Sequence, residues 1–211
     1  MLPVILAAAA AIALPPLVPG GCTAPAADHR DEAGCYLLGE MTADHVPSKL
    51  HWHIVEFPEL NDAQTEAIKR RWSKAVLAHG RIWLLVMGRR EEKISSGRSL
   101  KVIGPMLAPT GDTVSIRFLV SNFPPGMHTR VHSHPSSEAF YVVDGEQCVE
   151  TPAEHHRIEA GDSYIVQGGL HMQAAAKGRK SLVALVLRPG DMWSQPEPAL
   201  EAHRFLRQVK L

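Results

Sequence analysis

Two histidines and a glutamate in the second half of the chain have a spacing that suits metal binding. His132 and His134 are separated by one residue, so on a β-strand both imidazoles point to the same face. Glu138 follows after a Pro-Ser-Ser turn and opens an apolar run. Two imidazoles and a carboxylate suit a divalent transition metal (Fe, Mn, Zn, Ni or Cu) better than calcium. We therefore predict a metal site here, with Glu138 also as the candidate catalytic base.

Short strands must position these residues. After Thr113, apolar segments of strand length follow one another, with glycine or proline at the turns between them. The run that starts at Glu138 reaches Asp144-Gly145, which predicts a hairpin turn. Many short strands with such turns predict a mainly β fold, an antiparallel jelly roll or barrel. Strands are expected at residues 114–120, 147–151, 156–159, 164–167, 171–175 and 181–187.

The spacing around the metal motif resembles the first signature of the cupin superfamily. Every fixed position of that signature is filled, by Gly126, His132, His134, Glu138 and Gly145. The resemblance implies a cupin-type double-stranded β-helix. It also implies a fourth metal ligand, which cupins supply from a second motif further along the chain.

That second motif is present only in part. Gly161 and Asp162 start it correctly, but Gln167 occupies the position where the family usually has proline. Without a gap, Met172 takes the place of the family's histidine; if one residue is deleted upstream, His171 takes it. A slip of one residue reverses the face that a strand residue occupies, so the sequence leaves both registers open. We name His171 as the expected fourth ligand.

The resemblance covers about residues 111–189 and implies more than one function. Cupins that resemble this chain include dioxygenases, oxalate-degrading enzymes, isomerases and non-catalytic binding proteins, and the motif does not divide them. The first expectation is a metal-dependent, oxygenase-like enzyme that acts on a small organic molecule, since two histidines and one carboxylate match the facial arrangement used for oxygen activation. The alternative is an exported metal- or ligand-binding module without turnover.

Composition narrows the choice of partners. The 211 residues carry 22 basic and 22 acidic side chains, and the sequence pI is about 7.2. Nothing in this balance favours nucleic acid or an anionic membrane surface, so a small-molecule ligand is the expected partner. A homodimer is kept as an open alternative.

The first 27 residues read as a leader for export to the periplasm or outside the cell. They form an apolar, alanine-rich run with several prolines, and no lysine or arginine precedes Arg30. Ala24-Pro25-Ala26 resembles a signal-peptidase site, whereas the residues before Cys22 resemble a lipoprotein box that would place a lipid anchor on this cysteine. Both outcomes stay open.

The region from 28 to 110 is expected to pack on a barrel that spans 111–190. Strands are predicted at 35–38, 50–57 and 81–87, and a helix at 61–78, where Ile68, Trp72 and Val76 recur at helical spacing. Residues 191–211 form a tail with a predicted helix at 199–209.

Two further patterns in the sequence have weaker readings. A second His-x-His pair, His51 and His53, lacks a following glutamate, so it is interpreted as polar positions of an amphipathic strand. Cys35 and Cys148 are the two cysteines outside the predicted leader, and a disulfide between them is the alternative to two isolated thiols.

Overall fold

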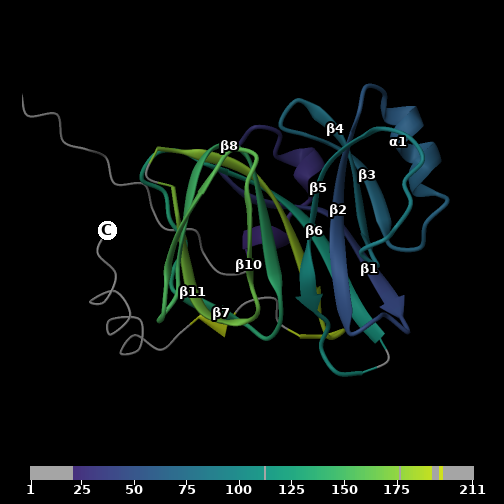
Figure 1. The fold of residues 1–211 in the computed structure, drawn as a ribbon. Coiled ribbons are helices and arrows are strands. Elements are labelled where there is room, and N and C mark those ends of the chain that lie inside the picture. The colour runs from purple at the N-terminus through teal and green to yellow at the C-terminus, as the bar shows by residue number, and fades with distance from the viewer. Residues whose placement is uncertain (1–20, 112, 176, 192–194, 197–211) are drawn as a thin grey trace, which may run out of the picture.

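The fold consists of two antiparallel sheets, one of which curls into a barrel (Figure 1). The computed structural model describes residues 21–111, 113–175, 177–191, 195 and 196. The barrel sheet has the order β1-β6-β12-β8-β11-β7-β13, and β9 and β10 also pair with β8. Its strands are β1 (Gly34–Asp44), β6 (Thr113–Phe123), β7 (His132–His134), β8 (Glu138–Glu150), β9 (His155–Glu159), β10 (Ser163–Val166), β11 (Gly169–Ala174), β12 (Arg179–Leu187) and β13 (Gln195–Pro196).

The smaller sheet has the order β3-β4-β2-β5 and packs against the outside of the barrel. Its strands are β2 (Lys49–Phe57), β3 (Ser73–Ala78), β4 (Arg81–Gly88) and β5 (Arg98–Leu107). The expected mainly β cupin-type barrel is therefore confirmed. The boundary predicted at residue 110 stays a prediction, and β1, from the region before it, pairs with β6.

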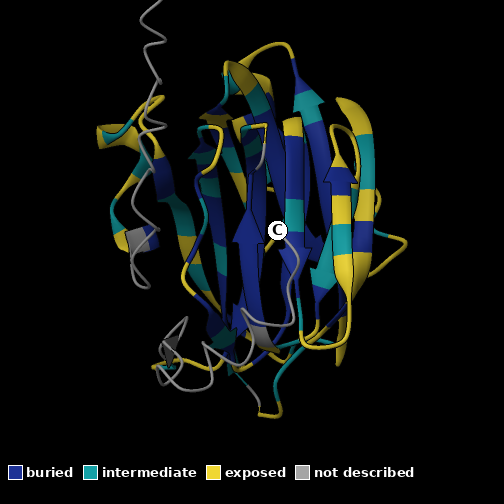
Figure 2. Cartoon of the chain, turned by 90° about the vertical axis from the view of Figure 1, so that its left-hand side faces the viewer, coloured by how far each residue is buried: buried dark blue, intermediate teal, exposed yellow. Residues whose placement is uncertain are grey.

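Alternating side chains on the shared strands build two separate cores. On β12, Leu182, Ala184 and Val186 face the smaller sheet, whereas Val183, Leu185 and Leu187 face the barrel interior. Because both faces are covered, the middle of this strand reads as a continuous apolar run. Figure 2 shows the central strands as almost uniformly buried.

The predicted helix exists, but it is shorter than expected. Helix α1 (Leu60–Ala67) covers the face of the smaller sheet that points away from the barrel, with Ala63 fully buried (Figure 1). The prediction that it continues to residue 78 is wrong, because residues 73–78 form β3, in which Val76 pairs with Trp83. Leu77 is 52% exposed between buried neighbours, which is the alternation of a strand.

Asp144-Gly145 does not form the predicted hairpin turn. Strand β8 continues through it to Glu150, and the pairing with β12 shifts register between Lys180 and Ser181. The extra residue in β8 is Val143, which forms a bulge two positions before Gly145, and Gly145 has a φ of 77°. The bulge turns β8 from its pairing with β12 and β10 to its pairing with β9 and β11.

The segment after residue 20 is tied to β1 by a disulfide. Cys22 pairs with Cys35 at a Cα–Cα distance of 4.6 Å, and Cys148 is a free thiol. The alternative of a bridge from Cys35 to Cys148 is therefore wrong, and so is the interpretation of Cys35 as an isolated thiol. The Leu37 N–H donates a hydrogen bond to Ala24 O at 2.8 Å. The last part of the predicted leader is thus held by the fold, and its first 20 residues lie outside the described part, as does the predicted helix at 199–209.

Candidate metal centre

Three strands bring the predicted residues together inside the barrel. His132 and His134 lie on β7, Glu138 is the first residue of β8, and His171 lies on β11 directly opposite His132. Their candidate ligand atoms all lie within 4.8 Å of one another, and the exposed fraction of each residue is 3% or less. Strand β7 pairs with β11 and β13, so Glu138 arrives from the start of a separate strand and not by a hairpin with β7.

Glu138 is the hub of the cluster. Its Oε2 lies 3.0 Å from His134 Nε2 and 2.9 Å from His171 Nε2. The side-chain amide of Gln173 donates to the same oxygen at 3.3 Å. The carboxylate is therefore held in place by two imidazoles and an amide in a buried site.

Backbone carbonyls orient two of the imidazoles. His132 Nδ1 lies 2.7 Å from Arg130 O, and His171 Nδ1 lies 3.2 Å from Gly169 O. With a metal bound, an N–H at Nδ1 of each ring would donate to its carbonyl and leave the lone pair on Nε2 for the metal. Such contacts are the usual way in which a protein fixes the tautomer and the direction of a metal-binding histidine.

Burial and mutual charge set the ionisation of the cluster. Burial and, to a smaller extent, the neighbouring imidazoles of His171 and His134 lower the pKa of His132 to about 3. Burial on its own raises the pKa of Glu138, but His134 and His171 lower it by more, so its pKa lies below the usual value. At neutral pH the cluster therefore holds a carboxylate and an uncharged His132, the forms that bind a metal.

The strand register separates His171 from Met172. His171 joins the cluster, whereas Met172 pairs with Glu150 on the far half of β8 and is not among the clustered residues. Consecutive strand residues point to opposite faces, so only one of the two can face the site.

The donor set fits a divalent transition metal. Ligands about 2.1 Å from a metal lie roughly 3 Å apart when they are adjacent and roughly 4.2 Å apart when they are opposite. The distances of 2.9 and 3.0 Å from Glu138 to two imidazoles match adjacent positions. Three imidazoles and one carboxylate would leave two of six positions open, and imidazole nitrogen favours Zn, Cu, Fe and Ni over calcium.

The other histidines singled out in the sequence lie elsewhere. His53 is buried in the smaller sheet, where its Nε2 lies 2.7 Å from Arg89 O, and His51 precedes it on β2. His128 forms an isolated bridge with Ala174 on β11. Within the described residues, the four-residue cluster is the one group of His, Cys, Asp or Glu with metal-ligand spacing.

Sequence reasoning missed two polar residues beside the cluster, Gln173 and Arg179. Both are buried in the barrel, and Gln173 lies two positions after His171 on the same face of β11. That spacing was the available signal. A cavity of about 20 Å³ lies beside the cluster and Gln173; it is lined by Cys22, Cys35, Ser121, Phe123, Thr129, His132, Glu138, Gln173 and Val183.

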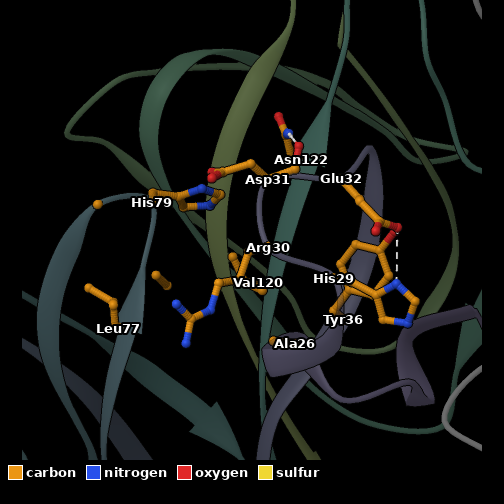
Figure 3. A pocket seen from close by; sticks show the side chains of 12 residues that line it. Ala26, His29, Arg30, Asp31, Glu32, Tyr36, Leu77, His79, Val120 and Asn122 are labelled. Atoms are coloured by element: carbon orange, nitrogen blue, oxygen red, sulfur yellow. Dashed lines mark hydrogen bonds and ion pairs between the residues drawn. The ribbon is translucent and has the colours of Figure 1, made fainter.

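A larger cavity, of about 210 Å³, lies away from this chemistry (Figure 3). It is bounded by the segment before β1, the turn between β3 and β4, and β6. His29 stacks on Tyr36 with ring centroids 4.5 Å apart and pairs with Glu32 at 3.0 Å. None of the predicted site residues lines it, so size alone does not locate the metal centre.

Comparison with known proteins agrees with the fold. Residues 119–196 match the family described as Cupin domain, and no curated protein matches the sequence. Similar solved structures include a cupin-2 domain containing protein from Shewanella frigidimarina NCIMB 400, with 20% identity over 38% of this chain and 76% of that chain and a TM-score of 0.31. KdgF from Halomonas sp. has 24% identity over 41% and 79%, with a TM-score of 0.33.

A third similar structure is the salicylate 1,2-dioxygenase of Pseudaminobacter salicylatoxidans, with 20% identity and a TM-score of 0.31. The alignment covers 33% of this chain and only 20% of the dioxygenase. These distant likenesses carry no argument about activity, so the family match is the finding that counts. The matched segment contains all four clustered residues and most of the barrel strands around them, so residues 119–196 of this chain form a cupin domain.

Proposed function

We propose that this protein is a metal-dependent cupin enzyme, oxygenase-like, that acts on a small organic molecule. His132, His134, Glu138 and His171 hold one divalent transition metal. The observation that carries the proposal is the buried group of three imidazoles and one carboxylate with all ligand atoms within 4.8 Å. Buried polar groups at this density are stable when they are mutually satisfied or bind an ion.

The chain's own residues prepare the site before a metal binds. His132 is already neutral at pH 7, so its lone pair is available without loss of a proton. Gln173 holds Glu138, and the carboxylate's lowered pKa favours a role as ligand over that of a base near neutral pH. A bound metal would supply Lewis acidity and open coordination positions for a substrate oxygen, water or dioxygen.

The second candidate is a binding module without turnover. The cavity beside the cluster measures about 20 Å³, space on the scale of one or two water molecules. Catalytic pockets for organic substrates are usually several hundred Å³. This small volume favours a metal-binding protein, or an enzyme whose cavity wall moves.

We further propose that the protein is exported and that processing occurs before Cys22. The disulfide between Cys22 and Cys35 supports this, because disulfides persist mainly in oxidising compartments. Among the described residues, none of the helices is both long and apolar enough to cross a membrane. Mass spectrometry of the amino-terminal peptide of secreted protein tests the proposal; a mature chain that starts after Cys22 would contradict it.

Metal analysis of protein purified without added metal tests the main proposal. One equivalent of a transition metal is expected in the wild type, and none in the His132→Ala/His134→Ala double variant. His128→Ala is the matched control, since His128 lies nearby but outside the cluster. Full occupancy in the double variant would refute the metal site. Oxygen-uptake screening with phenolic and dicarboxylic compounds then separates the enzyme from the binding module.

A further inference from the structure

A buried arginine lies in the same barrel interior as the cluster. Arg179 is 3% exposed. It is two and four positions before Ser181 and Val183 on β12, so all three side chains lie on the inward face of the strand. Its guanidinium carbon lies 3.9 Å from the centre of the Phe123 ring. Arginine is almost never buried unless it is paired with an opposite charge, so its partners are informative.

The hydrogen-bond partners of Arg179 are all uncharged. Nη1 donates to Ser121 Oγ at 2.8 Å and to Ser181 Oγ, and Nη2 donates to Gln173 Oε1 at 2.9 Å. None of the ion pairs formed by the described residues involves this arginine. Its Nε is buried without a hydrogen-bond partner.

The negative charge that balances Arg179 is that of Glu138, which is linked to the arginine through one intervening side chain. Gln173 accepts from Arg179 through Oε1 and donates to Glu138 Oε2 at 3.3 Å through Nε2, so a single amide links the two charges. Burial lowers the pKa of Arg179 to about 9, and the charge of Glu138 acts in the opposite direction. Arg179 is thus protonated at neutral pH, and the charge of Glu138 offsets only part of the free-energy cost of burying this cation.

Metal binding would remove that balance. A divalent ion, one carboxylate and three neutral imidazoles sum to one positive charge, and Arg179 adds a second. Two excess positive charges in a buried interior cost several kcal/mol unless an anion enters. The 20 Å³ cavity is the candidate place for this anion, because its wall includes His132 and Glu138 as well as three residues that contact Arg179, namely Ser121, Phe123 and Gln173.

We propose that this cavity receives the carboxylate of a small organic acid, held between the metal and Arg179. The inference rests on the proposed metal site and adds the charge class of the ligand. Space for one or two water-sized groups suits a carboxylate head. Arg179 lies behind Ser121, Phe123 and Gln173 in the cavity wall, and its Nε, which has no hydrogen-bond partner, leaves part of the guanidinium available to a carboxylate. Arg179 is then a specificity-determining residue that selects acids over their neutral analogues.

Anion titration of the cobalt-loaded protein tests this proposal. Cobalt content is measured first, and the visible absorption of the bound cobalt then reports the binding of acetate and of acetamide, its neutral isostere. The wild type is expected to bind acetate at least about 30-fold more tightly than acetamide, as expected when a buried charge pair is completed. Arg179→Gln should remove most of this preference while it leaves the cobalt content at one equivalent. Arg188→Gln is the control, since that side chain is 58% exposed and pairs with Asp191.

Two further arms keep the result unambiguous. The cavity wall includes Cys22 and Cys35, so the titration is repeated with the Cys22→Ser/Cys35→Ser variant; an Arg179-dependent preference in either form supports the proposal. If Arg179→Gln does not fold, the preference of the wild type decides. Bound cobalt without a preference for acetate, or a preference that survives in Arg179→Gln, overturns the inference alone. A wild type that takes up no cobalt overturns the proposed function as well.

Discussion

Glu138 Oε2 and His171 Nε2 lie 2.9 Å apart although the two residues are 33 positions apart in sequence. Glu138 begins β8, and His171 lies in the part of β11 that pairs with β7, so the contact joins the two motifs across the barrel. It also decides the register that the sequence leaves open, since Met172 pairs with Glu150 instead.

Replacement of His171 should therefore affect the metal far more than replacement of its neighbour. In His171→Ala the cluster loses an imidazole that contacts Glu138, so metal affinity is expected to fall by more than about 100-fold. Met172→Leu preserves an apolar side chain and should retain the metal. Competition with a chelator measures both affinities. A loss of only 10- to 100-fold in His171→Ala would place His171 behind the ligands as a supporting contact.

The metal-free protein should lose stability in mild acid. The pKa of His132 is 6.5 in an unfolded chain and about 3 in the fold, so between these values the unfolded chain binds the extra proton. The free energy of unfolding then falls by about 1.4 kcal/mol per pH unit as the pH drops. Glu138, whose pKa is lowered from 4.5, adds to the loss as the pH falls below that value.

Urea unfolding at several pH values between 7 and 4 measures this slope. His132→Asn keeps a donor for Arg130 O but takes up no proton, so its slope above pH 5 should be clearly shallower than that of the wild type. Equal slopes for the two proteins would show that His132 titrates normally.

The disulfide should contribute measurable stability. It closes a loop with a sequence separation of 13, and a loop of this size is worth about 3 kcal/mol. The Cys22→Ser/Cys35→Ser variant should lose about that much in urea unfolding, and Cys148→Ser, which removes the free thiol, less than about 1 kcal/mol. A reductant that leaves the wild type unchanged would contradict the bridge.

Gly145, near the bulge in β8, and Gly161 give a matched pair of glycine variants. A Cβ on Gly145 would lie 2.1 Å from Gly178 O, whereas a Cβ on Gly161 would meet nothing within 4 Å, and both residues have positive φ. Gly161→Ala should cost about 1 to 2 kcal/mol from backbone strain alone. Gly145→Ala should cost at least about 1 to 3 kcal/mol more, because backbone atoms must move. Similar unfolding energies for the two variants would argue against the close approach of Gly145 to Gly178.

The sequence predicts the chemistry of the site better than its assembly. His132, His134 and Glu138 are readable because strand alternation and spacing are local properties. Their partner on β11, His171, is named from the sequence as the expected ligand, but the one-residue ambiguity in the second motif leaves its register open. Arg179 is hidden for a related reason: its role depends on a face of β12 that only the pairing of distant strands defines.

The fold was harder to read in the first half of the chain. Trp72 and Val76 fit helical spacing, but Val76 lies in β3 and Trp72 directly before it. Both pack into the core between the two sheets, and this burial overrides the local pattern. Strand β5 was missed since its polar, half-exposed residues lack clear alternation. Asp144-Gly145 carries the usual signal of a tight turn, but here the left-handed Gly145 stays within β8, two positions after the bulged Val143.

Cys22 has one sulfur, and the structure commits it to Cys35. A thioether-linked lipid, the modification that a lipoprotein box would direct, needs the same atom. A lipid on Cys22 and the disulfide that forms part of the cavity wall beside His132 and Glu138 therefore exclude each other. Lipidation of this cysteine would anchor a barrel whose cavity wall lacks the disulfide. Oxidation would instead give an unanchored barrel whose cavity wall is cross-linked.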